Sequence, residues 1–136
     1  LMLLDYGADI FAKDRGAYTP LHWAAFSGYP VVVKLLLERG VPANVLSNAG
    51  ITPLLQAAAR GHLPVVSLLL DSQANPNLNA NDGSSPLLKA VANGHLAVVQ
   101  LLLNRGAHRH VSLRNGTTLD DIVAKAKDPR IRAIFG

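Results

Sequence analysis

The chain has 136 residues, of which 49% are hydrophobic and 16% charged, with a formal net charge of +4 and no cysteine. The lack of cysteine excludes disulfides and thiolate metal sites, and no apolar run reaches the roughly 18 residues of a membrane helix. The opening Leu1 to Leu4 is too short for a signal peptide, so we expect a soluble intracellular protein of the cytoplasm or, alternatively, the nucleus.

A stretch of seven residues recurs along the chain at a spacing of 33 positions. It reads TPLHWAA from Thr19, TPLLQAA from Thr52 and SPLLKAV from Ser85. A Thr or Ser suits a helix N-cap, and the Pro that follows has its φ already set for the first turn. The period predicts helices near residues 20 to 27, 53 to 60, 86 to 93 and 119 to 126.

Each of these helices is expected to lead into a second one. Gly28 and its counterparts one and two periods along suit the left-handed C-cap that ends the first helix. Val32, Leu35 and Leu36 then recur with the same period, and their i, i+3, i+4 spacing gives an apolar stripe. The unit is therefore a helix pair.

The end of the second helix differs in the middle copy. Gly40 and Gly106 close this helix in the other copies, whereas Gln73 takes the same place in the middle. A left-handed conformation at Gln73 costs roughly 1 kcal/mol, so we expect the softest joint of the stack there.

These features together resemble the ankyrin repeat family over the whole chain. They are the 33-residue unit, the T-P-L-H-x-A signature at Thr19 to Ala24, the pairs Gly61-His62 and Gly94-His95, and the V-V-x-L-L-L runs. The resemblance implies an all-α solenoid of stacked helix-turn-helix units with short β-hairpin fingers, which is the fold that we predict.

The period divides the chain into five parts. Residues 1 to 13 match the second helix and exit loop of a partial N-terminal repeat, because Met2 to Leu4 lie 33 positions before Leu35 to Leu37. Residues 14 to 46, 47 to 79 and 80 to 112 are predicted to form full repeats, and residues 113 to 136 a C-terminal capping repeat. We expect a monomeric segment of a longer array.

Two units depart from the pattern. In the first, the turn glycine has moved from position 17 to Gly16, which predicts an altered turn in that finger. In the last, Asp128 and Pro129 supply the N-cap and first residue of the second helix. Polar residues also replace apolar or small ones there, so we predict that most of these side chains are exposed, as in a capping repeat. These are Asp120, Lys125, Lys127, Arg130 and Arg132.

No constellation for catalysis or for a metal or other cofactor emerges. The family resemblance implies that His22 ties the Thr hydroxyl to the loop backbone. His62 and His95 are interpreted as hydrogen-bonded loop histidines, because stacked helices lie too far apart for one shared ion. His108 and His110 have no third ligand near them in the sequence, and adjacent Asp120 and Asp121 point apart on a helix. We expect neither an enzyme nor a small-molecule substrate.

The resemblance implies a protein or peptide partner on the concave face, formed by hairpin tips and the exposed side of the first helices. The candidate residues are Arg15, Tyr18, Trp23, Phe26, Ser27, Asn48, Ile51, Gln56, Ala59, Arg60, Asn81, Asp82, Ser84, Lys89, Ala92 and Asn93.

Three aromatic residues stand out among these candidates. Trp23 and Phe26 are three apart on one helix and so share a face, and Tyr18 lies just before the N-cap. Residues of this type are enriched in binding hot spots, which predicts an exposed apolar patch. The alternative is that Trp23 or Tyr29 fills space against an upstream repeat.

The charge distribution leaves other functions open. Residues 105 to 136 carry seven Lys or Arg and three Asp or Glu, which accounts for the whole excess of positive charge. One alternative is therefore nucleic-acid or acidic-partner binding by this end, although aromatic residues do not alternate with the basic ones. Another is a purely architectural spacer in a longer array.

Overall fold

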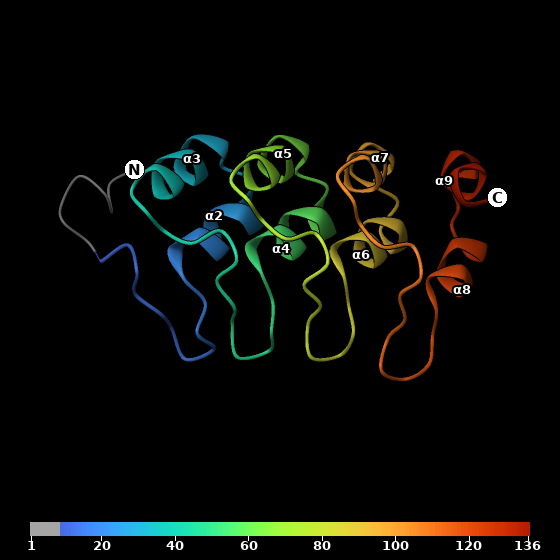
Figure 1. The fold of residues 1–136 in the computed structure, drawn as a ribbon, viewed down its shortest axis with the longest axis horizontal. Helices are drawn as coiled ribbons and strands as arrows, with labels where there is room; N and C mark the ends of the chain where they lie inside the picture. The colour runs from blue at the N-terminus through green and yellow to red at the C-terminus, as the bar shows by residue number, and fades with distance from the viewer. Residues whose placement is uncertain (1–8) are drawn as a thin grey trace.

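The computed structural model describes residues 9 to 136, which form a row of four helix pairs (Figure 1). The helices α2, α4, α6 and α8 form one layer, and α3, α5, α7 and α9 form the other. Their bounds are α2 Pro20–Ser27, α3 Pro30–Glu38, α4 Pro53–Arg60, α5 Leu63–Asp71, α6 Pro86–Ala92, α7 Leu96–Asn104, α8 Leu119–Ala124 and α9 Pro129–Phe135. Between residues 9 and 136 no sheet forms, and the sole bridge pairs Ser112 with Thr118. The all-α solenoid is confirmed.

The inner helices begin where the repeated stretch predicts. The hydroxyls of Thr52 and Ser85 accept hydrogen bonds at 3.1 Å from the backbone N–H groups of Leu55 and Leu88. Two helices are shorter than expected, since α6 ends at Ala92 and α8 at Ala124. In α8 the glycine that follows the other inner helices is replaced by Lys127, so the left-handed cap is absent there.

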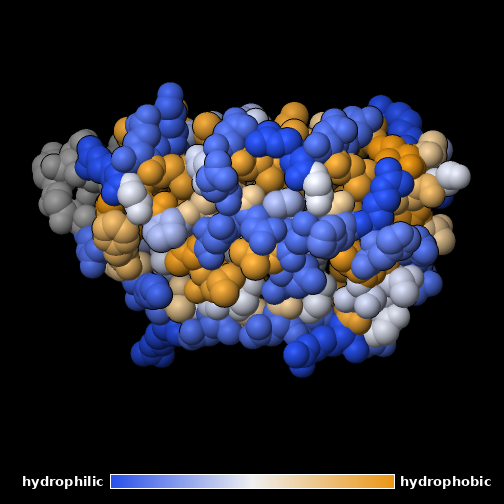
Figure 2. Space-filling model, viewed as in Figure 1, coloured by the Kyte–Doolittle hydropathy of each residue, from blue (hydrophilic) through white to orange (hydrophobic). Residues whose placement is uncertain are grey.

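The core runs along the row between the two layers. Leu36, Leu69 and Leu102 of the outer helices are at most 1% exposed, and Ala57 and Ala58 of α4 are fully buried. Small alanines let neighbouring inner helices approach closely, while burying each leucine contributes about 2 kcal/mol. Figure 2 shows one flank of the stack, where apolar residues surface between repeats and hydrophilic residues cover the fingers along the lower edge.

The altered turn predicted for the first finger is wrong. Ala17 has a φ of 63°, close to the 76° of Gly50 in the next finger, and its N–H donates to the Asp14 carbonyl at 2.9 Å. Gly50 makes the equivalent bond to Ser47, also at 2.9 Å. The finger keeps its shape because neighbouring fingers pair through their main chains, and Ala17 bears the left-handed strain.

Other local predictions can also be compared with the structure. Gln73 adopts the left-handed conformation with a φ of 75°, and the Asp128 side chain caps α9 by accepting from the Arg130 N–H. The predicted exposure of polar side chains in the last unit is confirmed. All five of them are exposed, namely Asp120, Lys125, Lys127, Arg130 and Arg132. Most of the partial repeat expected over residues 1 to 13 lies outside the described residues.

Histidines join successive repeats at their inner helices. The Nε2–H of His62 donates to the Phe26 carbonyl at 3.0 Å, and that of His95 to the Ala59 carbonyl at 3.1 Å. Each ring packs against the glycine that ends the preceding inner helix, so that a Cβ on Gly61 would lie 2.5 Å from His95 Nδ1. The interpretation of both as hydrogen-bonded loop histidines is confirmed.

Candidate functional site

The exposed aromatic residues of α2 are the main candidate for a functional site. Trp23 is 58% exposed and Phe26 is 36% exposed. Their rings meet edge to face, with centroids 6.4 Å apart and planes at 79°, an arrangement that aromatic pairs favour. The shared face expected from their spacing is therefore present.

A cation from the next repeat stacks on the Phe26 ring of this pair. The guanidinium of Arg60, the last residue of α4, lies 4.5 Å from the centroid of the Phe26 ring. This cation–π contact contributes about 0.5 to 1 kcal/mol at an exposed site. It brings together two predicted site residues that are 34 positions apart in the sequence, one period plus one residue.

The same aromatic residues border a hollow of about 560 Å³ between the first finger and the inner helices. We call it the aromatic hollow. It is lined by Asp14, Arg15, Gly16, Tyr18, His22, Trp23, Phe26 and Gln56. Of these, Asp14, Gly16 and His22 were not among the candidates, although their place in the same finger and helix was a usable signal.

Tyr18 is less exposed than the predicted patch requires. Its ring is half-buried and meets the His22 ring edge to face, with centroids 5.2 Å apart. A Cβ on Gly16 would lie 2.9 Å from the Tyr18 ring, so the ring can occupy this position because residue 16 has no side chain. Tyr18 therefore forms a wall of the aromatic hollow, while Trp23 and Phe26 supply the exposed surface.

Gln56 carries an unsatisfied polar atom beside the aromatic residues. Its side chain lines the aromatic hollow, and its Oε1 is buried without a hydrogen-bond partner. Buried acceptors in proteins are rarely left unpaired, because each loses its bond to water without replacement. Between residues 9 and 136 no other buried side-chain nitrogen or oxygen is left in this state.

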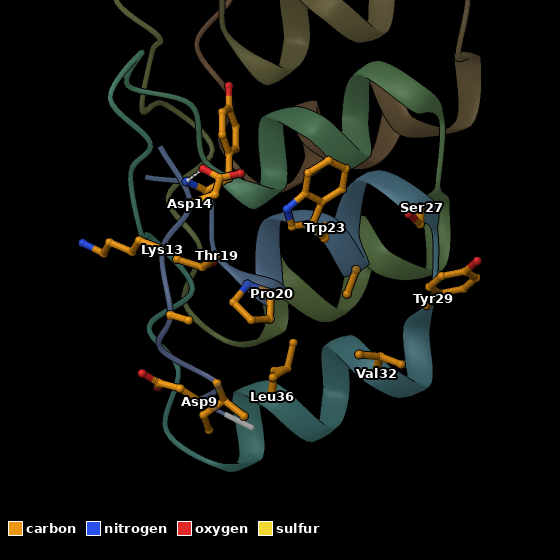
Figure 3. A pocket seen from close by; sticks show the side chains of 14 residues that line it. Asp9, Lys13, Asp14, Thr19, Pro20, Trp23, Ser27, Tyr29, Val32 and Leu36 are labelled. Carbon is orange, nitrogen blue, oxygen red and sulfur yellow. Dashed lines mark hydrogen bonds between the residues drawn. The ribbon is translucent and has the colours of Figure 1, made fainter. Parts of the chain in front are cut away.

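A second pocket, of about 530 Å³, lies on the other side of Trp23. We call it the end pocket. Figure 3 shows Pro20 and Trp23 of α2 beside it, with Val32 and Leu36 of α3 opposite. Ser27 lines this pocket rather than the aromatic hollow, and so does the exposed Tyr29. Trp23 thus separates two apolar cavities.

The remaining candidates are distributed along the fingers and inner helices. Asn48 and Asn81 link fingers, since their side-chain amides donate to the carbonyls of Arg15 and Asn48 at 3.1 Å. The Asn93 amide donates to the Ala59 carbonyl at 2.8 Å, and the half-buried Ile51 offers its carbonyl to His22. These groups hold neighbouring repeats together.

Five further candidates differ in exposure. Asp82 is exposed and accepts from the N–H of the buried Ser84 at 2.9 Å, and this hydrogen bond lowers the pKa of Asp82. Lys89 is half-buried on α6, Ala59 is half-buried on α4, and Ala92 is exposed at the end of α6. They lie beyond the aromatic hollow, so the structure gathers only the candidates near α2 and α4 into one cavity.

His22 has the structural place that the family resemblance implies. Its Nδ1 accepts from the Thr19 N–H at 3.1 Å, and its Nε2–H donates to the Ile51 carbonyl at 2.8 Å. Burial lowers the pKa of His22, since the charged ring would lose water. The ring is therefore neutral and joins the first inner helix to the next finger.

Across residues 9 to 136 no three His, Cys, Asp or Glu side chains gather as ligands for a metal ion. The Asp121 carboxylate accepts from the Thr118 N–H at 3.0 Å and so acts as a capping group. Among the described helices, none has the length and apolar character to span a membrane.

Similarity to known proteins agrees with this architecture. A family model for three copies of the ankyrin repeat matches residues 21–115, and one for many copies matches residues 1–37. The human protein phosphatase 1 regulatory subunit 27 is 37% identical over 49 residues, which are 36% of this chain and 32% of that protein.

Two further relatives are similar over shorter shares of their length. A Candida albicans palmitoyltransferase is 47% identical over 38 residues, 28% of this chain and 5% of the enzyme. A putative ankyrin repeat protein of fowlpox virus is 35% identical over 48 residues, 35% of this chain and 11% of the viral protein. The chain thus spans about a third or less of these relatives. Because the repeat model matches more than half of its residues, this chain belongs to the ankyrin repeat family.

Proposed function

We propose that the chain is a non-enzymatic module that binds a partner protein or peptide on its concave face. Ankyrin repeats are in general protein–protein interaction modules. The observation that carries the proposal is the exposed pair Trp23 and Phe26, whose counterparts one repeat along are Gln56 and Ala59. Since those counterparts are smaller or more polar, the fold does not require aromatics there, and contact with a partner accounts for them.

The roles of the polar residues support a module without catalysis. His22, His62 and His95 each donate to a backbone carbonyl of a neighbouring repeat. Asp121 caps a helix. These side chains therefore have structural roles, which accords with a binding module.

The relatives are consistent with a binding role. The human relative is, by name, a regulatory subunit of a phosphatase. Its similarity extends over 49 residues, so the proposal takes from it a binding role and not the phosphatase as a partner. The palmitoyltransferase match covers 5% of that enzyme, too little to suggest its activity here.

The basic end offers a weaker alternative. Lys125 and Lys127 are exposed, whereas the Arg130 guanidinium pairs with the Asp128 carboxylate at 2.9 Å. Phosphate contacts make affinity fall steeply with salt. We expect no specific binding of a labelled oligonucleotide at physiological salt, and a sequence-dependent affinity there would favour this alternative over the concave face.

The proposal is tested by selecting binders from a displayed library of random twelve-residue peptides. We expect Trp23→Ala and Phe26→Ala each to weaken the selected peptides by about 2 kcal/mol, or about 30-fold, the scale of a hot-spot residue. Phe11→Ala is the matched control, because Phe11 is 54% exposed and lines neither cavity.

Two results would contradict the proposal. One is a selection that yields no peptide dependent on Trp23 or Phe26, which favours the architectural spacer. The other is a loss of thermal stability in both variants while the folded protein binds the peptides unchanged, which identifies the rings as packing against another repeat.

A further inference from the structure

The aromatic hollow combines three chemical features within one repeat junction. Tyr18, Trp23 and Phe26 supply apolar walls, Gln56 supplies a buried acceptor without a donor, and Arg60 supplies a cation on the outer face of Phe26. We infer that the hollow binds an extended peptide in which an apolar side chain stands two residues from a carboxylate. The inference rests on the proposed function and specifies its partner.

The apolar part of the ligand follows from the cavity. Its volume of about 560 Å³ falls within the range of about 300 to 1,000 Å³ that small-ligand sites occupy. Three aromatic rings border it, and aromatic walls accept a large aliphatic or aromatic side chain together with adjoining backbone. A peptide segment meets this requirement with one anchoring residue.

The unsatisfied oxygen of Gln56 calls for a donor. An extended peptide presents a backbone N–H at each residue except proline, and the terminal amide of Gln56 turns easily about its last bond. A ligand N–H that bonds Oε1 relieves an acceptor that the folded chain leaves unpaired. Between residues 9 and 136 no backbone or side-chain group donates to this oxygen, so the ligand N–H supplies a hydrogen bond that the chain itself does not make.

The position of Arg60 calls for a carboxylate. In residues 9 to 136 the ion pairs are Arg105 with Asp71 and Arg130 with Asp128, so the Arg60 guanidinium has no carboxylate partner there. The Phe26 ring holds it beside the cavity. Side chains two residues apart in an extended segment lie on the same side, about 6.8 Å apart, which lets one enter the hollow while the other reaches Arg60.

A peptide fits these features better than a nucleic acid does. Aromatic rings beside arginine can also stack bases, but Asp14 lines the hollow together with Arg15, so the cavity lacks the excess of positive charge that a phosphate backbone requires. Asp14 Oδ1 accepts from the N–H groups of Gly16 and Tyr18 at 2.9 Å, and these bonds hold the carboxylate in place at the rim. Arg60 contacts the Phe26 ring but does not line the hollow, so a single peptide carboxylate can pair with it outside the cavity.

The test uses the peptides selected on the folded chain and their synthetic variants. We expect enrichment of Asp or Glu two positions from a large apolar residue. Arg60→Gln should weaken such a peptide about 2- to 5-fold, the range for an exposed ion pair, and more at low salt. Arg60→Glu should restore binding when the peptide acid becomes Lys. Arg39→Gln, at the end of α3, is the control for loss of charge alone.

Gln56→Met supplies a second and independent measurement. Methionine keeps the length of the side chain and removes the unpaired acceptor, so the melting temperature should stay level or rise while peptide affinity falls about 2- to 10-fold. A merely structural Gln56 would lower the melting temperature and leave affinity unchanged, which would overturn its part in the inference.

Other outcomes separate the inference from the proposed function. If peptides depend on Trp23 and Phe26 but show no acidic preference and ignore Arg60→Gln, the inference fails and the proposed function stands. If no peptide depends on the aromatic pair, both fail. Displacement of the peptide by a single-stranded oligonucleotide with equal sensitivity to Arg60→Gln would overturn the choice of a peptide ligand.

Discussion

Two neighbouring junctions of the stack differ in the side-chain hydrogen bonds that join their repeats. At the junction between α4 and α6, the side chains of Asn81 and His95 donate to the carbonyls of Asn48 and Ala59, both at 3.1 Å. At the junction between α6 and α8, the equivalent positions hold Arg114 and Asp128, which make neither bond. We call these the tied junction and the final junction.

Both junctions nevertheless keep the main-chain bond between fingers. The Asn81 N–H donates to the Ala49 carbonyl at 2.8 Å, and the Arg114 N–H donates to the Asp82 carbonyl at 2.9 Å. The finger pairing is therefore a property of the repeat backbone, whereas the side-chain ties depend on the residue at each position. Asp128 is used differently, because its carboxylate caps α9.

The largest expected effect compares the glycines of the two junctions. Gly61 and Gly94 have φ values of 75° and 76°, but a Cβ on Gly61 would meet the His95 ring, whereas nothing lies within 4 Å of one on Gly94. We expect Gly61→Ala to lower the free energy of unfolding by about 2 to 3 kcal/mol, from backbone strain and the displaced His95 bond. Gly94→Ala should cost about 1 to 2 kcal/mol, from strain alone. Urea unfolding measures both free energies. Equal losses in the two variants would contradict a stabilising role for the His95 contact at Gly61.

The next comparison removes the side chains at one equivalent position of the two junctions, His95 and Asp128. His95→Ala should lower stability by about 1 kcal/mol through the lost bond to Ala59, and hydrogen exchange should quicken in α4 and α6. Asp128→Ala should quicken exchange in α9 alone, because the cap acts within its own helix. The exposed His110→Ala is the control, and faster exchange spread over the whole chain in either variant would argue against separate junctions.

A pH titration distinguishes the first inner helix from its neighbours. His22 has its pKa lowered from 6.5 mainly by burial, so below that pH the unfolded chain binds the proton more readily than the folded chain. The free energy of unfolding should therefore be highest above pH 6.5 and should fall as the pH drops from 6.5 toward the lowered pKa of His22. His22→Leu should reduce this dependence, since Leu55 and Leu88 hold the same place in the next repeats. An unchanged profile in that variant would assign the effect to other groups.

The smallest expected effects relieve strain at two non-glycine positions. Ala17 and Gln73 have φ values of 63° and 75°, and glycine stands at the equivalent positions in other repeats. We expect Ala17→Gly and Gln73→Gly each to raise the free energy of unfolding by about 0.5 kcal/mol, because relief of strain exceeds the entropy that glycine adds to the unfolded chain. Melting temperatures measure this gain, and a loss in both variants would contradict the strain.

Sequence alone was sufficient for the architecture. The 33-residue period, with Thr or Ser before Pro at three helix starts, determined the order of the helices described between residues 9 and 136, because capping and apolar periodicity act locally. The structural role of His22 followed from the family resemblance. The exposed side chains of the last unit followed from polar residues at positions that are apolar elsewhere.

Contacts between repeats determined the features that the sequence did not predict. Ala17 was expected to change its turn, but pairing with the next finger imposes the left-handed conformation that glycine has elsewhere. The stacking of Arg60 on Phe26 and the unpaired oxygen of Gln56 also arise between units. A period specifies which residues share a helix, whereas the packing of one repeat on the next determines which side chains meet across the junction, which is why the aromatic hollow emerged only from the tertiary structure.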